Sequence, residues 1–361
     1  MKPTQALQDL GQSLWLDNIT RELLQSGTLA QRIQEYGLSG LTSNPSIFDQ
    51  AIESSSDYDQ DIGSGLEGGD SAEAIFFRLA IQDLRAAADL FAPIHQRTAG
   101  VDGWVSLEVS PELAYQGEGS AAAARRLHRQ AERDNLFIKI PGNEAGLGAI
   151  EESIFAGIPI NVTLLFSAEQ YLAAAQAYMR GLERRVEAGL SPDVASVASL
   201  FVSRWDKAVS DRVPERLRDR IGIAAAQQTY RAYRELLDSA RWQRLANLGA
   251  RPQRALWAST STKDPEAPDT LYVAALAAPL TINTMPDQTL LAFADHGVVG
   301  ESLGADGGQG DSVMAQLAEA GIDPKALALQ LQREGAEAFE RSWKSLLACI
   351  EGKAAQLSAA S

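Results

Sequence analysis

Residues 135–141 read Asn-Leu-Phe-Ile-Lys-Ile-Pro, a short apolar run with one lysine, Lys139, near its centre. The run is typical of a buried strand, since it is rich in β-branched and aromatic residues and ends at a proline. Phe137, Ile138 and Ile140 would surround the lysine and remove it from water. Desolvation disfavours the ammonium form of an amine, and the neutral amine is a nucleophile. The alternative is a lysine at a strand end whose ammonium reaches water.

Short apolar runs of this kind recur along the chain and alternate with longer helical patterns. Eight runs have the length of strands, at residues 12–17, 37–42, 103–109, 136–140, 158–162, 194–202, 255–259 and 280–283. Helical patterns occupy residues 21–35, 71–96, 118–134, 143–156, 167–188, 270–276 and 287–295, with two more helices in 205–249. Eight strand-then-helix units are typical of an α/β protein whose strands close into a (β/α)8 TIM barrel. An open doubly wound sheet is the alternative architecture.

Two regions do not fit the repeat. Residues 45–70 are irregular and glycine-rich near their end, so we expect an insertion there, with helical parts. Residues 300–311 are also glycine-rich and are expected to form a loop. A C-terminal helical extension then covers about 311–361, most of it a long amphipathic helix at about 323–358. We therefore predict a single barrel domain over residues 1–361 with extra helices.

Charge and composition restrict the partners of the protein. Its 361 residues carry a net charge of −15 with a pI near 4.7, which argues against nucleic acid and requires a local positive site for any anionic substrate. The single cysteine, Cys349, excludes an intrachain disulfide and favours a reducing compartment, so we expect the cytoplasm. No apolar run reaches the roughly 18 residues of a membrane span. The sequence leaves open whether the chain forms a homo-oligomer.

Polar residues recur near the ends of the predicted strands. If the apolar side chains of each strand pack outward on helices, the alternation of a barrel strand turns the intervening polar side chains inward. The inward set comprises Asp17, Thr42, Asn44, Ser106, Glu108, Lys139, Asn161, Thr163, Ser199, Ser259 and Asn283. One such residue is explained by a cap or a turn. A whole set with charges of both signs predicts a shared site at the carboxyl ends of the strands, because unpaired buried charges are costly.

The chemistry that suits this set is a Schiff base between Lys139 and a ketone. The iminium withdraws electrons, so a C–C bond β to it can break or form once acid/base groups move the protons. Glu108 and Asp17 are the candidates for proton transfer, and Thr163 could hold a water beside the amine. Metal-assisted aldol chemistry is the alternative, but the three histidines, His95, His128 and His296, fall on or just past predicted helices. We therefore expect neither a metal nor another cofactor.

A phosphate group is the expected anion. Arg204 follows the sixth predicted strand, and Lys263 follows the seventh in a hydroxyl-rich segment, so both lie at the carboxyl end. Guanidinium groups bind phosphate oxygens in a bidentate way. The alternative for Arg204 is a surface ion pair with Asp206 or Asp211. The glycines of 300–310 fit no nucleotide-binding motif.

Five segments together resemble the transaldolase family, and its longer bacterial subfamily in particular. They are Trp-Leu-Asp at 15–17, Leu-Thr-Ser-Asn-Pro-Ser-Ile-Phe at 41–48, Val-Ser-Leu-Glu-Val at 105–109, Ile-Lys-Ile-Pro at 138–141 and Ile-Asn-Val-Thr-Leu-Leu-Phe-Ser at 160–167. The resemblance implies a barrel like that of the Schiff-base (class I) aldolases. It also implies transfer of a dihydroxyacetone unit from sedoheptulose 7-phosphate to glyceraldehyde 3-phosphate, in the pentose phosphate pathway.

The resemblance assigns roles residue by residue. It implies that Lys139 forms the Schiff base, that Glu108 acts through a water held with Thr163, and that Asp17 serves the hydroxyl at the cleaved bond. It also implies that Asn44 and Asn161 hold the dihydroxyacetone hydroxyls and that Ser199 and Arg204 bind the phosphate. A phosphate contact of Lys263 is inferred from its position alone, and Thr42 and Ser259 are predicted to bind substrate as well. The chain departs from the family pattern after the seventh strand. Better-known members have an arginine there, whereas this chain has Lys263 as its nearest cation.

Two other functions use the same constellation. One is a fructose 6-phosphate aldolase-like enzyme that releases free dihydroxyacetone. The other is a sugar-phosphate binder without catalysis, against which an intact set of Lys139, Glu108 and Asp17 argues. An acceptor aldehyde added to an assay separates the two enzymes.

Overall fold

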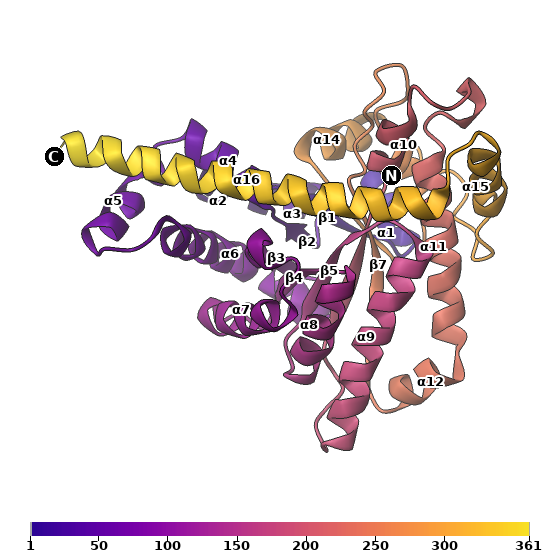
Figure 1. Cartoon of the computed structure of the whole chain (residues 1–361), viewed down its shortest axis with the longest axis horizontal. Helices are drawn as coiled ribbons and strands as arrows, with labels where there is room; N and C mark the ends of the chain where they lie inside the picture. Colours follow the sequence, from indigo (N-terminus) through magenta and orange to yellow (C-terminus); the bar gives the residue numbers. More distant parts are fainter. Residues whose placement is uncertain (1, 361) are drawn as a thin grey trace.

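The computed structural model describes residues 2–360, the last two by their backbone alone, and its centre is a closed barrel of parallel strands (Figure 1). The strands follow one another in chain order, and the last pairs with the first. They are β1 Ser13–Asp17, β2 Gly40–Thr42, β3 Trp104–Glu108, β4 Leu136–Pro141, β5 Ile160–Leu165, β6 Ser196–Phe201, β7 Arg254–Ala258 and β8 Ile282–Met285. The predicted (β/α)8 barrel is confirmed, and the open sheet is excluded.

Helices surround the barrel, as Figure 1 shows. The helices before β5 are α1 Pro3–Asp9, α2 Arg21–Gln25, α3 Thr28–Tyr36, α4 Pro45–Ser54, α5 Asp59–Glu67, α6 Ala72–Arg97, α7 Gly117–Ala131 and α8 Glu144–Phe155. Those after it are α9 Ala168–Glu187, α10 Ser203–Val209, α11 Ile221–Asp238, α12 Ala240–Asn247, α13 Leu271–Ala275, α14 Asp287–His296, α15 Gly310–Glu319 and α16 Pro324–Ala360. Within 2–360, no helix combines the length and the hydropathy that a membrane span needs.

Two apolar layers follow from the alternation of side chains along the strands. Ile138 and Ile140 of β4 point outward into the layer between barrel and helices, together with most of the buried aliphatic residues. Trp15, Trp104 and Phe137 point inward near the amino ends of their strands, where the Trp104 and Phe137 rings stack with centroids 4.1 Å apart. These large rings fill the interior at the amino end of the barrel, so the polar interior positions lie toward the carboxyl end.

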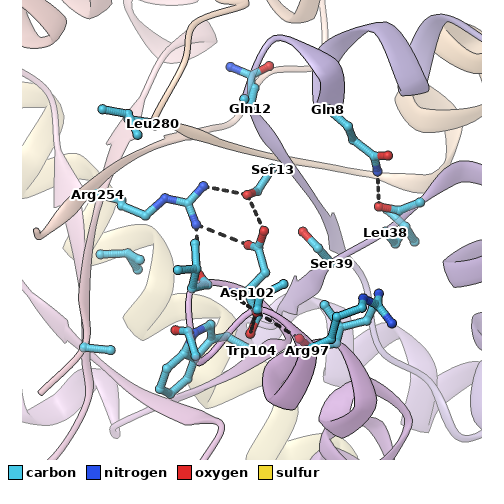
Figure 2. Close-up of a pocket in the computed structure, with 18 of the residues that line it drawn as sticks. Gln8, Gln12, Ser13, Leu38, Ser39, Arg97, Asp102, Trp104, Arg254 and Leu280 are labelled. Carbon is cyan, nitrogen blue, oxygen red and sulfur yellow. Dashed lines mark hydrogen bonds and ion pairs between the residues drawn. The ribbon is translucent and has the colours of Figure 1, made fainter. Parts of the chain in front are cut away.

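The amino end of the barrel also holds a partly buried ion pair, seen in Figure 2 beside a cavity of about 850 Å³. The Arg254 guanidinium lies 3.2 Å from Asp102 Oδ1 and donates to Ser13 Oγ at 2.5 Å and to the Thr281 and Val101 carbonyls, each at 3.0 Å. Ser13 Oγ in turn donates to Asp102 Oδ2 at 2.7 Å. Each charge at this end therefore has partners within the protein.

The β8 register corrects one predicted orientation. Asn283 was expected inside the barrel, but it pairs with Leu14 and Trp257, which both belong to the outer apolar layer. Thr284 is the residue that faces inward, and its hydroxyl lies 2.7 Å from that of Thr42. The prediction slipped by one because the strand was started at Leu280, which instead forms a turn with a φ of 63°.

Of three helical regions outside the regular repeat, one differs from the expectation. Residues 45–70, read as irregular, contain both α4 and α5, in line with the helical parts expected of an insertion. The two-helix prediction for 205–249 is wrong, because α10, α11 and α12 occupy this stretch and a 3-10 turn at Glu215–Leu217 separates the first two. The long C-terminal helix exists as predicted, and α16 continues without a break through Gly352.

Candidate active site

A cavity of about 300 Å³ opens at the carboxyl end of the barrel and gathers most of the predicted site residues. It is lined by Asp17, Thr42, Asn44, Lys139, Thr163, Ser199, Arg204, Ser259 and Lys263. Glu108 and Asn161 are the two predicted residues that do not line it. Side chains from six strands and the segments after them therefore meet at one place, as the shared orientation of barrel strands requires.

Lys139 lies at the centre of the site and does not reach bulk water. The residue is 5% exposed, and its Nζ donates to the Ser43 carbonyl at 3.0 Å and to Glu108 Oε2 at 3.4 Å. The parallel pairing of β3 with β4 sets Glu108 directly beside Lys139. The alternative of a lysine that extends into solvent is thus excluded by the structure.

Two carboxyl groups flank the amine in surroundings that disfavour their charge. Burial raises the pKa of Glu108 above its usual range, and the nearby Lys139 ammonium only partly opposes the shift. Burial likewise raises the pKa of Asp17, against the Lys139 charge and a 2.7 Å hydrogen bond from Thr42 Oγ1. Carboxyl groups with raised pKa values can exchange protons nearer to neutral pH than ordinary carboxylates.

The polar residues around these charges differ in how many partners they have. Thr163 Oγ1 is buried and has no hydrogen-bond partner in the part of the chain described. Asn161, by contrast, donates to Ser106 Oγ at 3.1 Å and accepts from Ser199 Oγ at 2.7 Å beneath the cavity. The side chain of Asn44 caps α4, because its Oδ1 accepts a hydrogen bond from the Ile47 amide at 3.2 Å. Among these three side chains, the Thr163 hydroxyl is therefore the one whose hydrogen-bonding capacity is left for a ligand or a water.

Two cations, Arg204 and Lys263, line the same cavity. Arg204 makes no ion pair or hydrogen bond with any residue that the structure describes, and its guanidinium lies 5.0 Å from the Phe201 ring centroid. Burial lowers its pKa, although the distant charges of Glu108 and Glu334 oppose this. The expected alternative, a pair with Asp206, is excluded, since that carboxylate accepts from two backbone amides and a tyrosine hydroxyl.

Lys263 is the second of these cations. Its Nζ donates to Ser261 Oγ at 2.5 Å, and burial together with the charges of Lys207 and Arg204 lowers its pKa. In a protein with a net charge of −15, these two neighbouring cations have no carboxylate partner among the described side chains and make this part of the cavity locally positive.

The residues that line the cavity but were not predicted as site residues are Ser46, Phe201, Ala258, Ser261, Thr284, Pro286 and Phe339. Thr284 was missed because of the slip in β8, and Phe339 comes from α16, more than 170 residues beyond the last of the matching motifs. No local signal distinguishes Phe339 from the other apolar positions of an amphipathic helix. His95, His128 and His296 lie on α6, α7 and α14, and residues 2–360 contain no group of three side chains that could hold a metal ion.

A buried amine between two carboxyl groups at the carboxyl end of a (β/α)8 barrel places this protein in the class of lysine-dependent aldol enzymes. Comparison with known proteins then narrows the class. The family model described as transaldolase/fructose-6-phosphate aldolase matches residues 14–350. The chain therefore belongs to this family, as its five sequence segments predicted.

Several relatives match over nearly their whole length. A transaldolase of Parafrankia sp. (strain EAN1pec) is 45% identical, with 97% of each chain covered. One of Arthrobacter sp. (strain FB24) is 43% identical, with 99% of each chain covered. Transaldolase 2 of Nostoc punctiforme is 39% identical, with 98% of this chain and 97% of the relative covered. Family and relatives together make this protein an enzyme of the transferase class.

Proposed function

We propose that this protein transfers a dihydroxyacetone unit from sedoheptulose 7-phosphate to glyceraldehyde 3-phosphate, giving erythrose 4-phosphate and fructose 6-phosphate. The observation that carries the proposal is the buried Lys139 amine, 3.4 Å from a carboxyl group whose pKa burial raises. An amine in this position can add to the ketone carbon of a sugar, while Glu108 supplies the proton that expels water. The product of this step is an iminium on Lys139.

The second step breaks the C–C bond. Asp17 accepts the proton of the hydroxyl on the far side of that bond, and the electron pair of the bond moves into the iminium to give an enamine. The four-carbon aldehyde leaves as erythrose 4-phosphate. Asp17 suits this role because it lines the cavity and carries a raised pKa in its buried site.

The last steps reverse the first two on the acceptor. The enamine adds to the aldehyde of glyceraldehyde 3-phosphate, and Asp17 returns its proton to the new hydroxyl. Water then adds to the iminium and releases fructose 6-phosphate and the free amine. Thr163, whose hydroxyl has no partner among the described residues, would hold that water beside Lys139 and Glu108.

Substrate binding follows the division of charge in the cavity. Arg204 and Lys263, with the hydroxyls of Ser199 and Ser259, would bind the phosphate, because they form its positive and hydroxyl-rich side. Thr42, Asn44 and Asn161 would hold the hydroxyls of the dihydroxyacetone unit. For Asn161 this requires that a substrate hydroxyl replace Ser199 Oγ, which now donates a hydrogen bond to Asn161 Oδ1. We also propose a cytoplasmic location, which the single cysteine favours.

Borohydride reduction in the presence of fructose 6-phosphate tests the proposal directly. Reduction converts an iminium to a stable amine, so a dihydroxyacetone-derived mass should appear on the peptide that contains Lys139. Attachment at another lysine, such as Lys263, would contradict the assignment, and a sample without sugar is the control. Because the family model also covers fructose-6-phosphate aldolase, an assay with and without acceptor aldehyde completes the test. A transferase should produce little free dihydroxyacetone when the acceptor is present.

A further inference from the structure

The C-terminal helix α16 reaches the active site from outside the barrel (Figure 1). It contacts β5 and packs on α4, α5 and α6. Three of its residues, Gln332, Gly335 and Phe339, touch the catalytic end, and their spacing of three and seven positions puts them on one face of the helix. This face is therefore part of the wall of the site.

Gln332 fixes the helix to the strand that carries Thr163. Its Nε2 donates to the Leu164 carbonyl at 2.9 Å and to the Gly142 carbonyl at 3.3 Å. Leu164 has a φ of 59° and lies within a register shift of β5, so its carbonyl is turned out of the regular ladder. Gln332 thus supplies the Leu164 carbonyl with a hydrogen-bond donor that the neighbouring strand does not provide. The same bond fixes the position of α16 relative to the site.

Gly335 and Phe339 then shape the space around Arg204. A Cβ added at Gly335 would lie 3.3 Å from Arg204 Nη1 and 2.9 Å from a Leu164 methyl. Any residue larger than glycine at this position would therefore force one of these two side chains to shift. The Phe339 ring centroid lies 6.0 Å from the Arg204 guanidinium and 5.9 Å from Lys139 Nζ. Phe201 lies 6.4 Å from Phe339 at an angle of 63°, so the two rings flank the same guanidinium.

We propose that Phe339 is a positioning residue that holds Arg204 ready for the phosphate of a phosphorylated ketose, in a slot completed by Phe201 and Gly335. The inference rests on the proposed function and extends it to the C-terminal helix. Arg204 makes no hydrogen bond or ion pair in the part of the chain that the structure describes, so aromatic faces are what orient it. An arginine already in place loses less conformational entropy when the anion binds.

Phe339→Leu tests the slot because it keeps an apolar side chain but removes the ring. We expect the KM for fructose 6-phosphate to rise about three- to thirtyfold, which spans the range of cation–π contacts, with kcat changed less than about twofold. Trapping of dihydroxyacetone by borohydride at Lys139 should change less than about twofold. That sugar has no phosphate, and Lys139 Nζ keeps its hydrogen bonds to Ser43 and Glu108 although it loses the ring 5.9 Å away. Phe339→Tyr keeps the ring face and should restore the KM. Gly335→Ala should raise the KM by crowding Arg204.

Trp343→Phe is the matched control on the same helix. Trp343 lies one turn beyond Phe339 and packs on Phe76 and Phe77 with ring centroids 5.0 and 5.6 Å away, outside the phosphate side of the cavity. This variant should leave the KM for fructose 6-phosphate unchanged. If Phe339→Leu weakened both sugars equally, or lowered only the melting temperature, the slot would be refuted.

Failure of the slot and failure of the proposed function give different results. Trapping of wild-type Lys139 by dihydroxyacetone requires no phosphate site, so its absence would overturn the proposed function alone. Inorganic phosphate then still tests the slot, because a ligand that binds only the folded state raises the melting temperature. Wild type should reach a given rise in melting temperature at a several-fold lower phosphate concentration than Phe339→Leu. Equal concentrations would overturn the slot.

Discussion

Each end of the barrel holds a cation beside a carboxyl group, but the pair at the carboxyl end is buried and the pair at the amino end is only partly buried. At the amino end Arg254 lies 3.2 Å from Asp102 and also donates to a hydroxyl and two carbonyls (Figure 2). At the carboxyl end Lys139 lies 3.4 Å from Glu108 and has one further acceptor. A pair whose groups all have hydrogen-bond partners supports the fold, whereas a buried pair with few partners remains available for chemistry.

The surroundings of the two pairs extend this difference. Around Lys139, burial raises the pKa values of Asp17 and Glu108, and Thr163 has an unpartnered hydroxyl among the described residues. Substrate would complete these interactions. The comparison therefore predicts that changes at the carboxyl end alter activity more than stability, and that changes at the amino end do the reverse.

Lys139→Met should have the largest effect on activity. Loss of the nucleophile should reduce kcat by more than about 10⁴-fold, the scale on which covalent catalysts fail. The free energy of unfolding should change by less than about 1 kcal/mol, because Glu108 can take up a proton once the ammonium is gone. Turnover and chemical denaturation of one preparation measure both. A strongly destabilised variant would show that this pair, like the one at the amino end, supports the fold.

Glu108→Gln and Asp17→Asn should follow, each with a loss of about 10²–10⁴-fold. The two losses should fall on different steps: Glu108→Gln should slow trapping of dihydroxyacetone at Lys139, while Asp17→Asn should leave trapping intact and slow C–C cleavage. Single-turnover release of erythrose 4-phosphate separates them. If both variants slowed trapping equally, the division of roles would be wrong.

The pH dependence of wild type sharpens the same assignment. Burial raises the pKa of Glu108 and of Asp17, so the ionised forms appear only above the usual carboxyl range. Because Asp17 must be ionised to accept a proton in the cleavage step, kcat/KM should rise with pH through a limb that lies above about pH 4. This limb should disappear in Asp17→Asn. A limb in the ordinary carboxyl range would mean that the site is better solvated than its burial indicates.

Arg254→Met should give the opposite result at the amino end. It leaves Asp102 with the Ser13 hydroxyl and a 3.5 Å contact to the Trp15 indole. Because the pair is only partly buried, the free energy of unfolding should fall by about 2–3 kcal/mol, less than for a fully buried pair. The kcat of the folded enzyme should stay within about twofold of wild type. Adding Asp102→Asn removes the unpaired charge and should restore part of the stability. Loss of activity without loss of stability would contradict the division between the two ends.

Alternation along the strands explains why the sequence predicts so much of this site. A barrel strand must be apolar on its outer face, so Ile138 and Ile140 determine the inward orientation of Lys139 without any knowledge of the fold beyond the barrel. The same rule failed at β8, where Asn283 was assigned inward in place of Thr284, because a one-residue error in the start reverses every side chain. A prediction of inward or outward orientation is therefore only as reliable as the strand boundary from which the alternation is counted.

The contribution of α16 could not be predicted for a different reason. Phe339 reaches Lys139 and Arg204 through tertiary packing, and the helix pattern tells only that this face is apolar. The register of α16 over the barrel depends on Gln332 and on the space at Gly335, which have meaning only once β5 and its bulge are in place. Contacts between segments this far apart have no local signature.

Arg204→Ala should produce the smallest of these effects and tests the phosphate side of the comparison. A charge-assisted hydrogen bond contributes roughly 1.5–3 kcal/mol, so the KM for fructose 6-phosphate should rise about ten- to a hundredfold. Trapping of dihydroxyacetone should change little, because Lys139 and the groups around it are untouched. Stability should hold or increase, since Arg204 is half-buried and makes no ion pair within residues 2–358, whose side chains are described.

Lys207→Ala provides a matched control for Arg204→Ala. Lys207 is also on α10 and its charge influences Lys263, but its side chain does not line the cavity, so its removal should change the KM less than about threefold. Equal losses of Arg204→Ala on both sugars would mean that the arginine supports the whole cavity and not the phosphate. A lower melting temperature with unchanged discrimination would place Arg204 with Arg254, as a cation that serves the fold.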